Sequence, residues 1–536
     1  MPKRSYVLLF ILGLLVATGA AYLQTNPGYM DAYYYFNGGK QIAFGSGWSE
    51  MFLWNYLDDP AGLPHPGFTY WMPLTSLVAA GGIKLFPGAP SAFEAAQVLF
   101  ILVSALVAPV TAELAYQFSG RKGFGWLAGV LVIFSGFYFP FMTTTDSFSI
   151  YMLLGGVFFL VYTRVHRARI EILGYLAGLM HLARADGLLW LGIAGLGVLI
   201  DLTRHNEDSL SVRGLLRNGF SKRFLFAGVR IVVAYLVVMF PWYVRNLEVF
   251  GSLFPPGGGR TLWVLSYDEL FSYPAGQLSP GRWWAAGLGN LLLARGEAFL
   301  VNLQTTFASM GVLLPGVLAV LGFWNLRKHR TVRLGLIGLG VLFVFMTVVF
   351  PFSGMRGSYF HSGAAFVPLI MAAAPVGIDV LTKASLRRFK TWKDRRIRPF
   401  YLGVVVLFVI GFSVVLYFSA VVGLEGDPVM VWNQAEVRYQ AVDEVLDRLG
   451  AEPTDLVVAS NPPGFFIVTG RPAIAIPDGT LEVLLAVSGD YGAEWVLVEP
   501  NHPDGLMDFY ESPQDAGQLV WMETVAEVHI FRWEGE

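Results

Sequence analysis

The sequence contains no cysteine among its 536 residues. The absence of thiols excludes disulfides, thiolate zinc sites, iron–sulfur clusters and cysteine nucleophiles. Any chemistry must therefore use oxygen and nitrogen groups. Charge is also scarce, at 14% of the residues, and the net charge is only -2. This balance argues against a nucleic-acid partner.

Hydrophobic residues, in contrast, make up 55% of the chain, and the mean hydropathy is +0.54. Ordinary soluble domains have a much lower value. A helix needs about 20 apolar residues to cross the ~30 Å hydrocarbon core of a bilayer. Runs of that length recur along the chain between groups of Lys and Arg, so the sequence predicts a polytopic α-helical membrane protein.

We predict eleven membrane spans. Nine are read directly as apolar runs, at residues 5–23, 91–118, 123–141, 147–162, 224–243, 308–324, 334–350, 363–381 and 401–422. The other two are short spans that cross out and back within residues 171–201. The first run could also serve as a signal peptide, but its length favours an anchor.

Basic residues set the predicted orientation. Six clusters hold 24 of the 37 Lys and Arg. They lie at residues 3–4, 121–122, 164–169, 204–223, 327–333 and 383–398. Cytoplasmic loops are enriched in Lys and Arg, so the N-terminus is predicted inside and the C-terminus outside. The apolar stretch 67–86 must then stay re-entrant or interfacial, because a further crossing would invert every later basic loop.

The composition changes at residue 424. Residues 425–536 contain 21 Asp and Glu but only four basic residues. The sequence therefore predicts a soluble α/β domain at 424–536, on the outer side, and a transmembrane domain at 1–423 with long outer loops at 24–90 and 245–306. Expected helices of the soluble domain are 434–449 and 480–487, and expected strands are 455–460, 495–499 and 525–533.

Two aspartates follow directly from this topology as candidates for chemistry. Asp31 follows the first span, within an aromatic segment that suits the membrane interface. It fits either a helix N-cap in an interfacial turn or a general base at the outer surface. Asp146 ends the short outer turn before the span at 147–162, where it fits either an N-cap at Ser147 or a second active-site carboxylate.

The paired short spans at 171–201 break at residues 183–187. Each arm of about 14 residues reaches only ~21 Å, so the tip would be submerged below the outer interface. Arg184 and Asp186, together with His181, are then tolerable only beside a wet cavity, a partner charge or an anionic ligand. A mutual Arg184–Asp186 pair and a phosphate-binding Arg184 both fit this position.

Two more arginines close the outer ends of spans. Arg245 follows the span at 224–243, and Arg356 follows the span at 334–350. Snorkelling anchors beside Trp and Tyr explain each of them. Together with Arg184 they would also form a basic pocket that suits a lipid-linked phosphate.

The order of several short motifs resembles the GT-C superfamily of membrane glycosyltransferases. The resemblance is to the branch that includes protein O-mannosyltransferases and lipid A aminoarabinose transferases, and it covers residues 6–381. The motifs are Asp31-Ala32-Tyr33-Tyr34-Tyr35, His65-Pro66, Tyr70-Trp71-Met72-Pro73, Leu182-Ala183-Arg184-Ala185-Asp186-Gly187 and Pro241-Trp242-Tyr243-Val244-Arg245-Asn246.

This resemblance implies an inverting transfer of sugar from a polyprenyl-phosphate donor to an acceptor at the outer face. Asp31 would be the base, with Asp146 as the second catalytic candidate. Arg184, Arg245 and Arg356 would bind the donor phosphate. The substrate pocket would include Tyr34, His65, Asp186 and His361. The acceptor, whether lipid, glycan, protein or another polymer, stays open.

One departure concerns metal. Oligosaccharyltransferases of the same superfamily use a divalent cation and a Trp-Trp-Asp motif, whereas here Trp283-Trp284 is followed by Ala285. No cofactor or metal is therefore expected, although Asp58-Asp59 leaves room for a cation. The alternative from another class is a lipid-sugar transporter or flippase, which would favour paired halves that the chain does not show.

Overall fold

The computed structural model describes the whole chain except residues 165–169, 207–211, 390, 392, 424–428 and 536. Two compact units are present. The first, here called the helical unit, comprises Met1–Leu23, Gln97–Val244 and Arg295–Leu424. The second, called the sheet unit, comprises Gln24–Ala96, Arg245–Ala294 and Glu425–Glu536.

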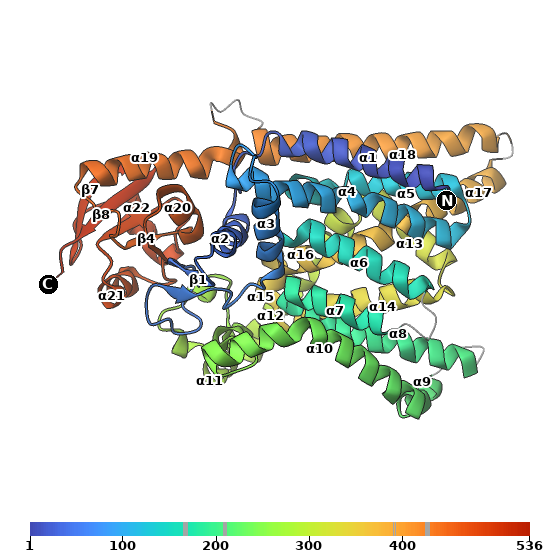
Figure 1. Cartoon of the computed structure of the whole chain (residues 1–536), viewed down its shortest axis with the longest axis horizontal. Coiled ribbons are helices and arrows are strands. Elements are labelled where there is room, and N and C mark those ends of the chain that lie inside the picture. Colours follow the sequence, from blue (N-terminus) through green and yellow to red (C-terminus); the bar gives the residue numbers. More distant parts are fainter. Residues whose placement is uncertain (165–169, 207–211, 390, 392, 424–428, 536) are drawn as a thin grey trace. The chain divides into compact units, whose positions relative to one another are not determined.

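The helical unit is a bundle of long helices that lie alongside one another (Figure 1). Its main helices are α1 (Lys3–Ala21), α5 (Lys122–Ile133), α6 (Ser147–Arg164), α7 (Glu171–Ala183), α8 (Leu189–Asn206), α9 (Val212–Gly219), α13 (Leu314–Asn325), α14 (Arg330–Val344), α16 (Tyr359–Gly363), α17 (Val367–Arg388) and α18 (Asp394–Tyr417). Three more helices pass from one unit into the other: α4 (Ala92–Ser119), α10 (Lys222–Phe250) and α12 (Leu288–Gln304).

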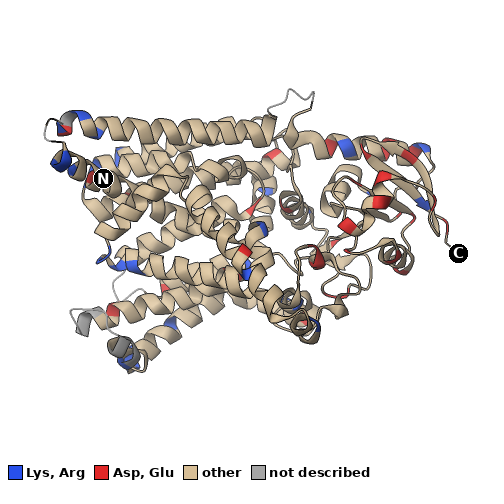
Figure 2. Cartoon of the chain, turned by 180° about the vertical axis from the view of Figure 1, so that it is seen from behind, with Lys and Arg blue, Asp and Glu red and all other residues tan. Residues whose placement is uncertain are grey.

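The predicted class, a polytopic helical membrane protein, is confirmed. Among the described residues, eight helices are long and apolar enough to cross a membrane, and one further pair is bent by 95°. The helices α5 and α7 are shorter but apolar. The eight helices and the bent pair account for nine of the eleven predicted spans. The helices α5 and α7 lie at the other two, but with 12 and 13 residues each is too short to cross a membrane alone. Figure 2 shows Lys and Arg concentrated at one set of helix ends in this unit.

The predicted span 308–324 is wrong in one respect, because it is not one straight helix. A π-helical turn at Thr305–Met310 is followed by a break, and only then does α13 begin. Val312 and Leu313 at the break have φ values of 48° and 54°, which non-glycine residues rarely adopt. Hydropathy could not register this break, because every residue in it is apolar or glycine.

Helix α17 is the central helix of the bundle. In the apolar stretch Pro351–Arg388 the most hydrophobic window is 89% buried, compared with 28% for α10. A Cβ atom at Gly377 would lie 1.8 Å from the carbonyl oxygen of Leu318 on α13. Only glycine fits there, so α13 and α17 approach backbone to backbone, as small residues permit in membrane helices.

The sheet unit is built around a six-stranded sheet with the order β2-β5-β4-β6-β8-β7. The strands are β2 (Phe52–Leu53), β4 (Val457–Ala459), β5 (Ala473–Ala475), β6 (Trp495–Val498), β7 (Leu519–Val525) and β8 (Val528–Trp533). The first four in the sheet are parallel, and β8 and β7 are antiparallel. Helices α19 (Gln434–Arg448) and α21 (Leu481–Tyr491) confirm the two predicted helices, while α20 (Pro462–Thr469) was not predicted.

Strand β2 comes from the first long loop, and it pairs with β5. Nearby, Tyr56 donates a hydrogen bond to the carbonyl oxygen of Ala475 and is buried in the same core as Val458 and Phe531. A domain made of residues 424–536 alone therefore leaves out part of its own sheet. The prediction missed β2 because a two-residue strand carries almost no periodicity.

Two helices of the first loop position its chemistry. Helices α2 (Met30–Phe44) and α3 (Leu74–Leu85) pack closely, since a Cβ atom at Gly39 would lie 2.6 Å from that of Ala79. The hydroxyl of Ser76 also donates to the carbonyl oxygen of Tyr35, at 2.9 Å. With 12 residues, α3 is about 18 Å long, which is too short for a full crossing.

Candidate functional site

Asp31 is the second residue of α2 and lies in its first turn. The N-cap of this helix is Tyr29, which makes no side-chain capping bond, so the predicted N-cap role of Asp31 is wrong. The aromatic segment also differs from the interfacial turn that we expected, because Tyr33, Tyr34 and Tyr35 are at most 2% exposed. A carboxylate in the first turn of a helix interacts favourably with the helix dipole.

Glu50 is a buried acid that the sequence analysis missed. Its carboxyl group receives hydrogen bonds from the Tyr34 hydroxyl and, at 3.4 Å, from the backbone N–H of Phe68. Burial raises the pKa of Glu50 to about 8, and these two hydrogen bonds only partly oppose the effect. Glu50 is therefore mostly a neutral acid at pH 7. The sequence did contain a signal for this residue, because Glu50 is a single acidic residue within a run of apolar and aromatic residues.

Arg245 holds the loop that covers Glu50. Its Nη2 donates to the carbonyl oxygen of Gly67 at 2.6 Å, and its guanidinium lies 5.1 Å from the ring centre of Phe250. A Cβ atom at Gly67 would lie 2.9 Å from Oε1 of Glu50, so this position has no room for a side chain. Arg245, Gly67, Glu50 and Tyr34 thus form one connected group, which we call the Glu50 cluster.

His65 adjoins the Glu50 cluster through a short sheet. Strands β1 (Ser49–Glu50) and β3 (His65–Pro66) are antiparallel, and Glu50 lies opposite His65. The His65 Nε2 lies 3.0 Å from Oδ2 of Asp58, and both side chains are nearly buried. Asp59 instead pairs with Arg260. The two adjacent aspartates that left room for a cation therefore have separate partners.

Asp146 in the helical unit is completely buried within a polar run, residues 143–147, whose members are all at most 1% exposed. Its Oδ1 accepts the N–H of Ser147, where α6 begins, and its Oδ2 lies 3.3 Å from Nε2 of His361. The carboxylate thus serves the start of the helix and also faces an imidazole. The two predicted interpretations of Asp146, an N-cap at Ser147 and a second active-site carboxylate, stay open.

His361 lies between two acceptors. Its Nδ1 is 3.0 Å from the carbonyl oxygen of Gly357, and its ring stacks on Phe148 with 4.0 Å between the ring centres. A carbonyl oxygen only accepts, so Nδ1 carries the hydrogen, and a neutral ring would present a lone pair to the Asp146 carboxylate. A carboxylate oxygen and an imidazole nitrogen are both able to ligate a metal.

Arg184 lies in extended backbone between α7 and a 3₁₀ turn at Ala185–Leu188, which confirms the predicted break. Its Nε donates to Oδ1 of Asp186 at 3.0 Å and to the Ser362 hydroxyl at 3.3 Å. The mutual Arg184–Asp186 pair is thus present. The other oxygen of Asp186 is buried and has no hydrogen-bond partner within the described part of the chain.

His181 does not join this pair. It bonds to the Tyr235 hydroxyl, which in turn lies 2.7 Å from the Tyr243 hydroxyl. These hydrogen-bonded tyrosines of α10 thus replace part of the hydration that buried His181 loses.

The short helix α16 connects the predicted residues of the helical unit. Three consecutive residues of α16 make the contacts: the Phe360 carbonyl accepts from the Tyr138 hydroxyl, His361 faces Asp146, and Ser362 bonds to Arg184. We call this the α16 cluster. Arg356 precedes it in a π-helical turn, Gly354–Ser358, and is exposed.

The structure therefore brings together two groups of predicted residues. Asp146, Arg184, Asp186 and His361 meet through α16 in the helical unit. Tyr34 and Arg245 meet in the Glu50 cluster of the sheet unit, and His65 adjoins this cluster. Helix α2 of the same unit also carries Asp31. The convergence of the two groups on one substrate stays a prediction.

No protein-family model and no curated protein matches the sequence. Solved structures do match. The aminoarabinose transferase ArnT from Cupriavidus metallidurans in the apo state is 12% identical, with a TM-score of 0.58 over 99% of this chain and 98% of that one. The same ArnT bound to undecaprenyl phosphate gives a TM-score of 0.55, with the same identity and coverage.

The archaeal oligosaccharyltransferase AglB from Archaeoglobus fulgidus, in complex with an inhibitory peptide and a dolichol-phosphate, is also similar. Its TM-score is 0.52 at 12% identity, over 92% of this chain and 69% of that one. This chain has the GT-C fold. The predicted fold class is confirmed, including the C-terminal α/β region, and the resemblance seen in the short motifs is confirmed at the level of fold.

The raised pKa of Glu50 predicts how stability changes with pH. The folded-state pKa of about 8 exceeds the ordinary value of 4.5, so folding favours the protonated form. Stability from this group is fully present below pH 4.5 and is lost as the pH rises to about 8. Glutamine does not ionise, so the melting temperature of Glu50→Gln should rise relative to that of the wild type as the pH increases from 5 to 8. Melting curves across this range check it, with exposed Glu511→Gln as the matched control. Parallel curves for wild type and Glu50→Gln would contradict it.

Proposed function

We propose that this protein is an inverting glycosyltransferase that moves a sugar from a polyprenyl-phosphate donor to an acceptor at the outer membrane face. The observation that carries the proposal is the α16 cluster. It gathers a carboxylate, an imidazole and a guanidinium at the buried ends of membrane helices, where charge is costly and usually functional. The solved structures with this fold include complexes with undecaprenyl phosphate and dolichol-phosphate, which supports the donor class.

The reaction would be a single displacement. An acceptor hydroxyl or amine attacks the anomeric carbon from the side opposite the phosphate, and the bond between that carbon and the phosphate oxygen breaks. The acceptor loses its proton to Asp31. The departing polyprenyl phosphate gains negative charge, and it is a good leaving group that needs no general acid.

The arginines would stabilise this growing charge. Arg184 is held by Asp186 and Ser362, so its guanidinium is already oriented before the donor binds. Arg245 is fixed on Gly67, and Arg356 is exposed beside α16. Arginine suits this task because its planar fork can donate two hydrogen bonds to one phosphate.

The proposal commits to the donor class and not to one acceptor: lipid, glycan and protein acceptors all fit it. It requires no resident cofactor. If a divalent cation binds, the Asp146 carboxylate and the His361 imidazole would supply an oxygen and a nitrogen ligand.

The catalytic prediction concerns Asp31. Asp31→Asn keeps the shape of the side chain but removes proton acceptance, so turnover should fall about 10²- to 10⁴-fold while donor binding persists. A reconstituted assay with radiolabelled polyprenyl-phosphate sugar measures both. The matched control is Asp508→Asn, because Asp508 is likewise the second residue of a helix, α22 (Met507–Glu511), and is exposed. Normal transfer by Asp31→Asn would exclude Asp31 as the base.

The donor prediction concerns Arg184. One charge-assisted contact to phosphate contributes about 1.5–3 kcal/mol, so Arg184→Ala should weaken donor binding about 10- to 150-fold. Because this change also leaves Asp186 without its partner, the double variant Arg184→Ala with Asp186→Asn separates the two effects. Recovery of donor affinity in the double variant would return Arg184 to a structural role. If neither variant lost affinity for any polyprenyl-phosphate sugar, a transporter would become the better hypothesis.

The orientation is also part of the proposal. The chain is a multi-pass membrane protein, and we infer a cell-membrane location with the N-terminus and the loop at residues 383–398 in the cytoplasm and residues 425–536 outside. Cysteine accessibility suits this protein, since it has no native cysteine. A cysteine placed at exposed Lys393 should be protected from an impermeant maleimide in intact cells, while one at exposed Glu482 should react. The reverse pattern would overturn the orientation.

A further inference from the structure

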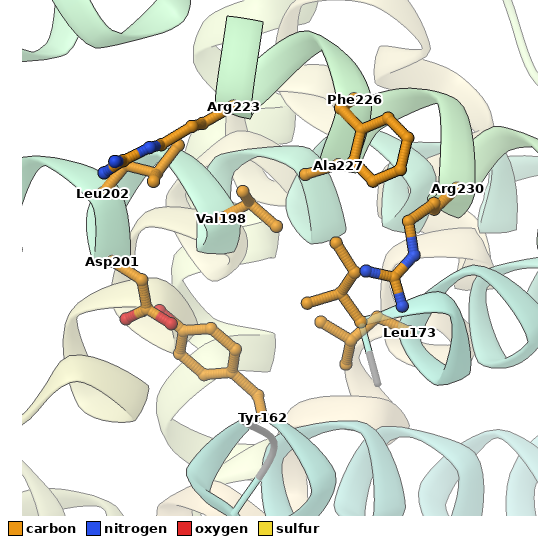
Figure 3. Close-up of a pocket in the computed structure, with 10 residues that line it drawn as sticks. Tyr162, Leu173, Val198, Asp201, Leu202, Arg223, Phe226, Ala227 and Arg230 are labelled. Atoms are coloured by element: carbon orange, nitrogen blue, oxygen red, sulfur yellow. The ribbon is translucent and has the colours of Figure 1, made fainter. Parts of the chain in front are cut away.

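A cavity of about 280 Å³ lies in the helical unit between the ends of α6, α7, α8 and α10 (Figure 3). Part of its wall is apolar, with Leu173, Val198 and Ala227 facing the space. Charged groups border the same space: Asp201 from α8, and Arg223 and Arg230 from α10. The two arginines are seven residues apart, so they project from the same face of α10.

The cavity lies where these helices end. Tyr162, which lines it, is two residues from the end of α6, and Arg223 is the second residue of α10. Asp146, in contrast, directly precedes the first residue of α6. The 18 residues of α6 rise about 27 Å, so the cavity and the α16 cluster lie near opposite ends of one membrane helix. A ligand in this cavity would therefore lie in the leaflet opposite the proposed donor site.

The charges around the cavity do not cancel. Arg230 forms an ion pair with Glu171, and Asp201 forms an ion pair with Arg330 at 2.9 Å. Arg223 is exposed and has no ion pair within the described residues. Among the described residues, the groups around the cavity thus leave one surplus positive charge, that of Arg223. That charge suits a monoanionic ligand better than a neutral or zwitterionic one.

The helix that supplies this charge faces lipid on its other side. Leu225, Val229 and Val233 recur every fourth residue of α10, and each is at least 55% exposed. Phe226, which lines the cavity, is also exposed to 67%. Acyl chains that cover this apolar face of α10 would therefore run directly past the cavity.

We propose that this cavity binds the headgroup of an anionic phospholipid, with Arg223 on the phosphate and the first part of an acyl chain against Leu173, Val198 and Ala227. The apolar wall is the reason for choosing a lipid over a soluble phosphate, because a free anion would gain nothing from it. The site is separate from the proposed glycosyl transfer and needs no substrate of that reaction.

Native mass spectrometry of the detergent-solubilised protein tests this proposal. Phosphatidylglycerol should bind to the wild type more tightly than phosphatidylcholine with the same acyl chains. Arg223→Gln should weaken phosphatidylglycerol binding about fivefold, the effect expected of one basic residue near an anionic headgroup. Lys222→Gln is the matched control, since it removes the same charge from the neighbouring residue, which is exposed and does not line the cavity. It should leave binding unchanged.

A second variant tests the apolar wall. Ala227→Phe should fill the cavity and reduce phosphatidylglycerol binding while Arg223 is intact; a melting curve on each variant checks that it is folded. Equal binding of phosphatidylcholine and phosphatidylglycerol to the wild type would overturn the proposal. Full displacement of the lipid by millimolar inorganic phosphate would also overturn the proposal, because it would indicate a site for a soluble anion. Equal losses of phosphatidylglycerol binding in Arg223→Gln and Lys222→Gln would overturn it as well.

Discussion

The cost of burying charge in a membrane protein is the constraint on which this structure depends. A charged side chain inside a bundle needs a partner, and here each buried member of the candidate site has one. Asp146 faces His361, and Arg184 pairs with Asp186. In the sheet unit, burial keeps Glu50 mostly neutral beside Tyr34 and the backbone of Phe68. The contact between Asp146 and His361 joins residues 215 positions apart, and Arg184 also donates to Ser362, 178 positions away. The same groups that would carry the chemistry therefore also fix the positions of α16, the α7–α8 break and the first outer loop.

This constraint also explains how much of the fold could be predicted. Apolar length and basic loops identify the membrane helices, because both reflect the bilayer directly. The break at Arg184 was predictable, because the basic clusters require residues 171–201 to cross out and back. The predicted length of the second arm was wrong, since α8 has 18 residues and the stretch Ala185–Thr203 is long enough to cross a membrane. The depth of the tip stays a prediction. The break before α13 was not, since its cause is the backbone conformation of Val312 and Leu313. Strand β2 was also missed, because it exists only through pairing with a strand about 420 residues later.

For the candidate site, the residues were easier to predict than their contacts. Asp146 and His361 were both candidates, but nothing in the sequence indicates that they face each other. The N-cap role of Asp31 failed because the helix begins at Met30, two residues earlier than an N-cap at Asp31 would require. Glu50 shows the opposite case, in which an acidic residue within an apolar run is a readable signal. The site thus combines local patterns, which a sequence displays, with tertiary pairings, which it does not.

The central claim is that the α16 cluster receives the phosphate of a polyprenyl-phosphate sugar. A cryo-electron microscopy structure of the protein in nanodiscs with such a donor tests it most directly. The account predicts density for the phosphate within about 4 Å of the Arg184 guanidinium, the usual ion-pair distance, and Asp31 facing the anomeric carbon on the side opposite the phosphate. A phosphate bound away from Arg184, or an anomeric carbon that Asp31 cannot approach, would contradict the account.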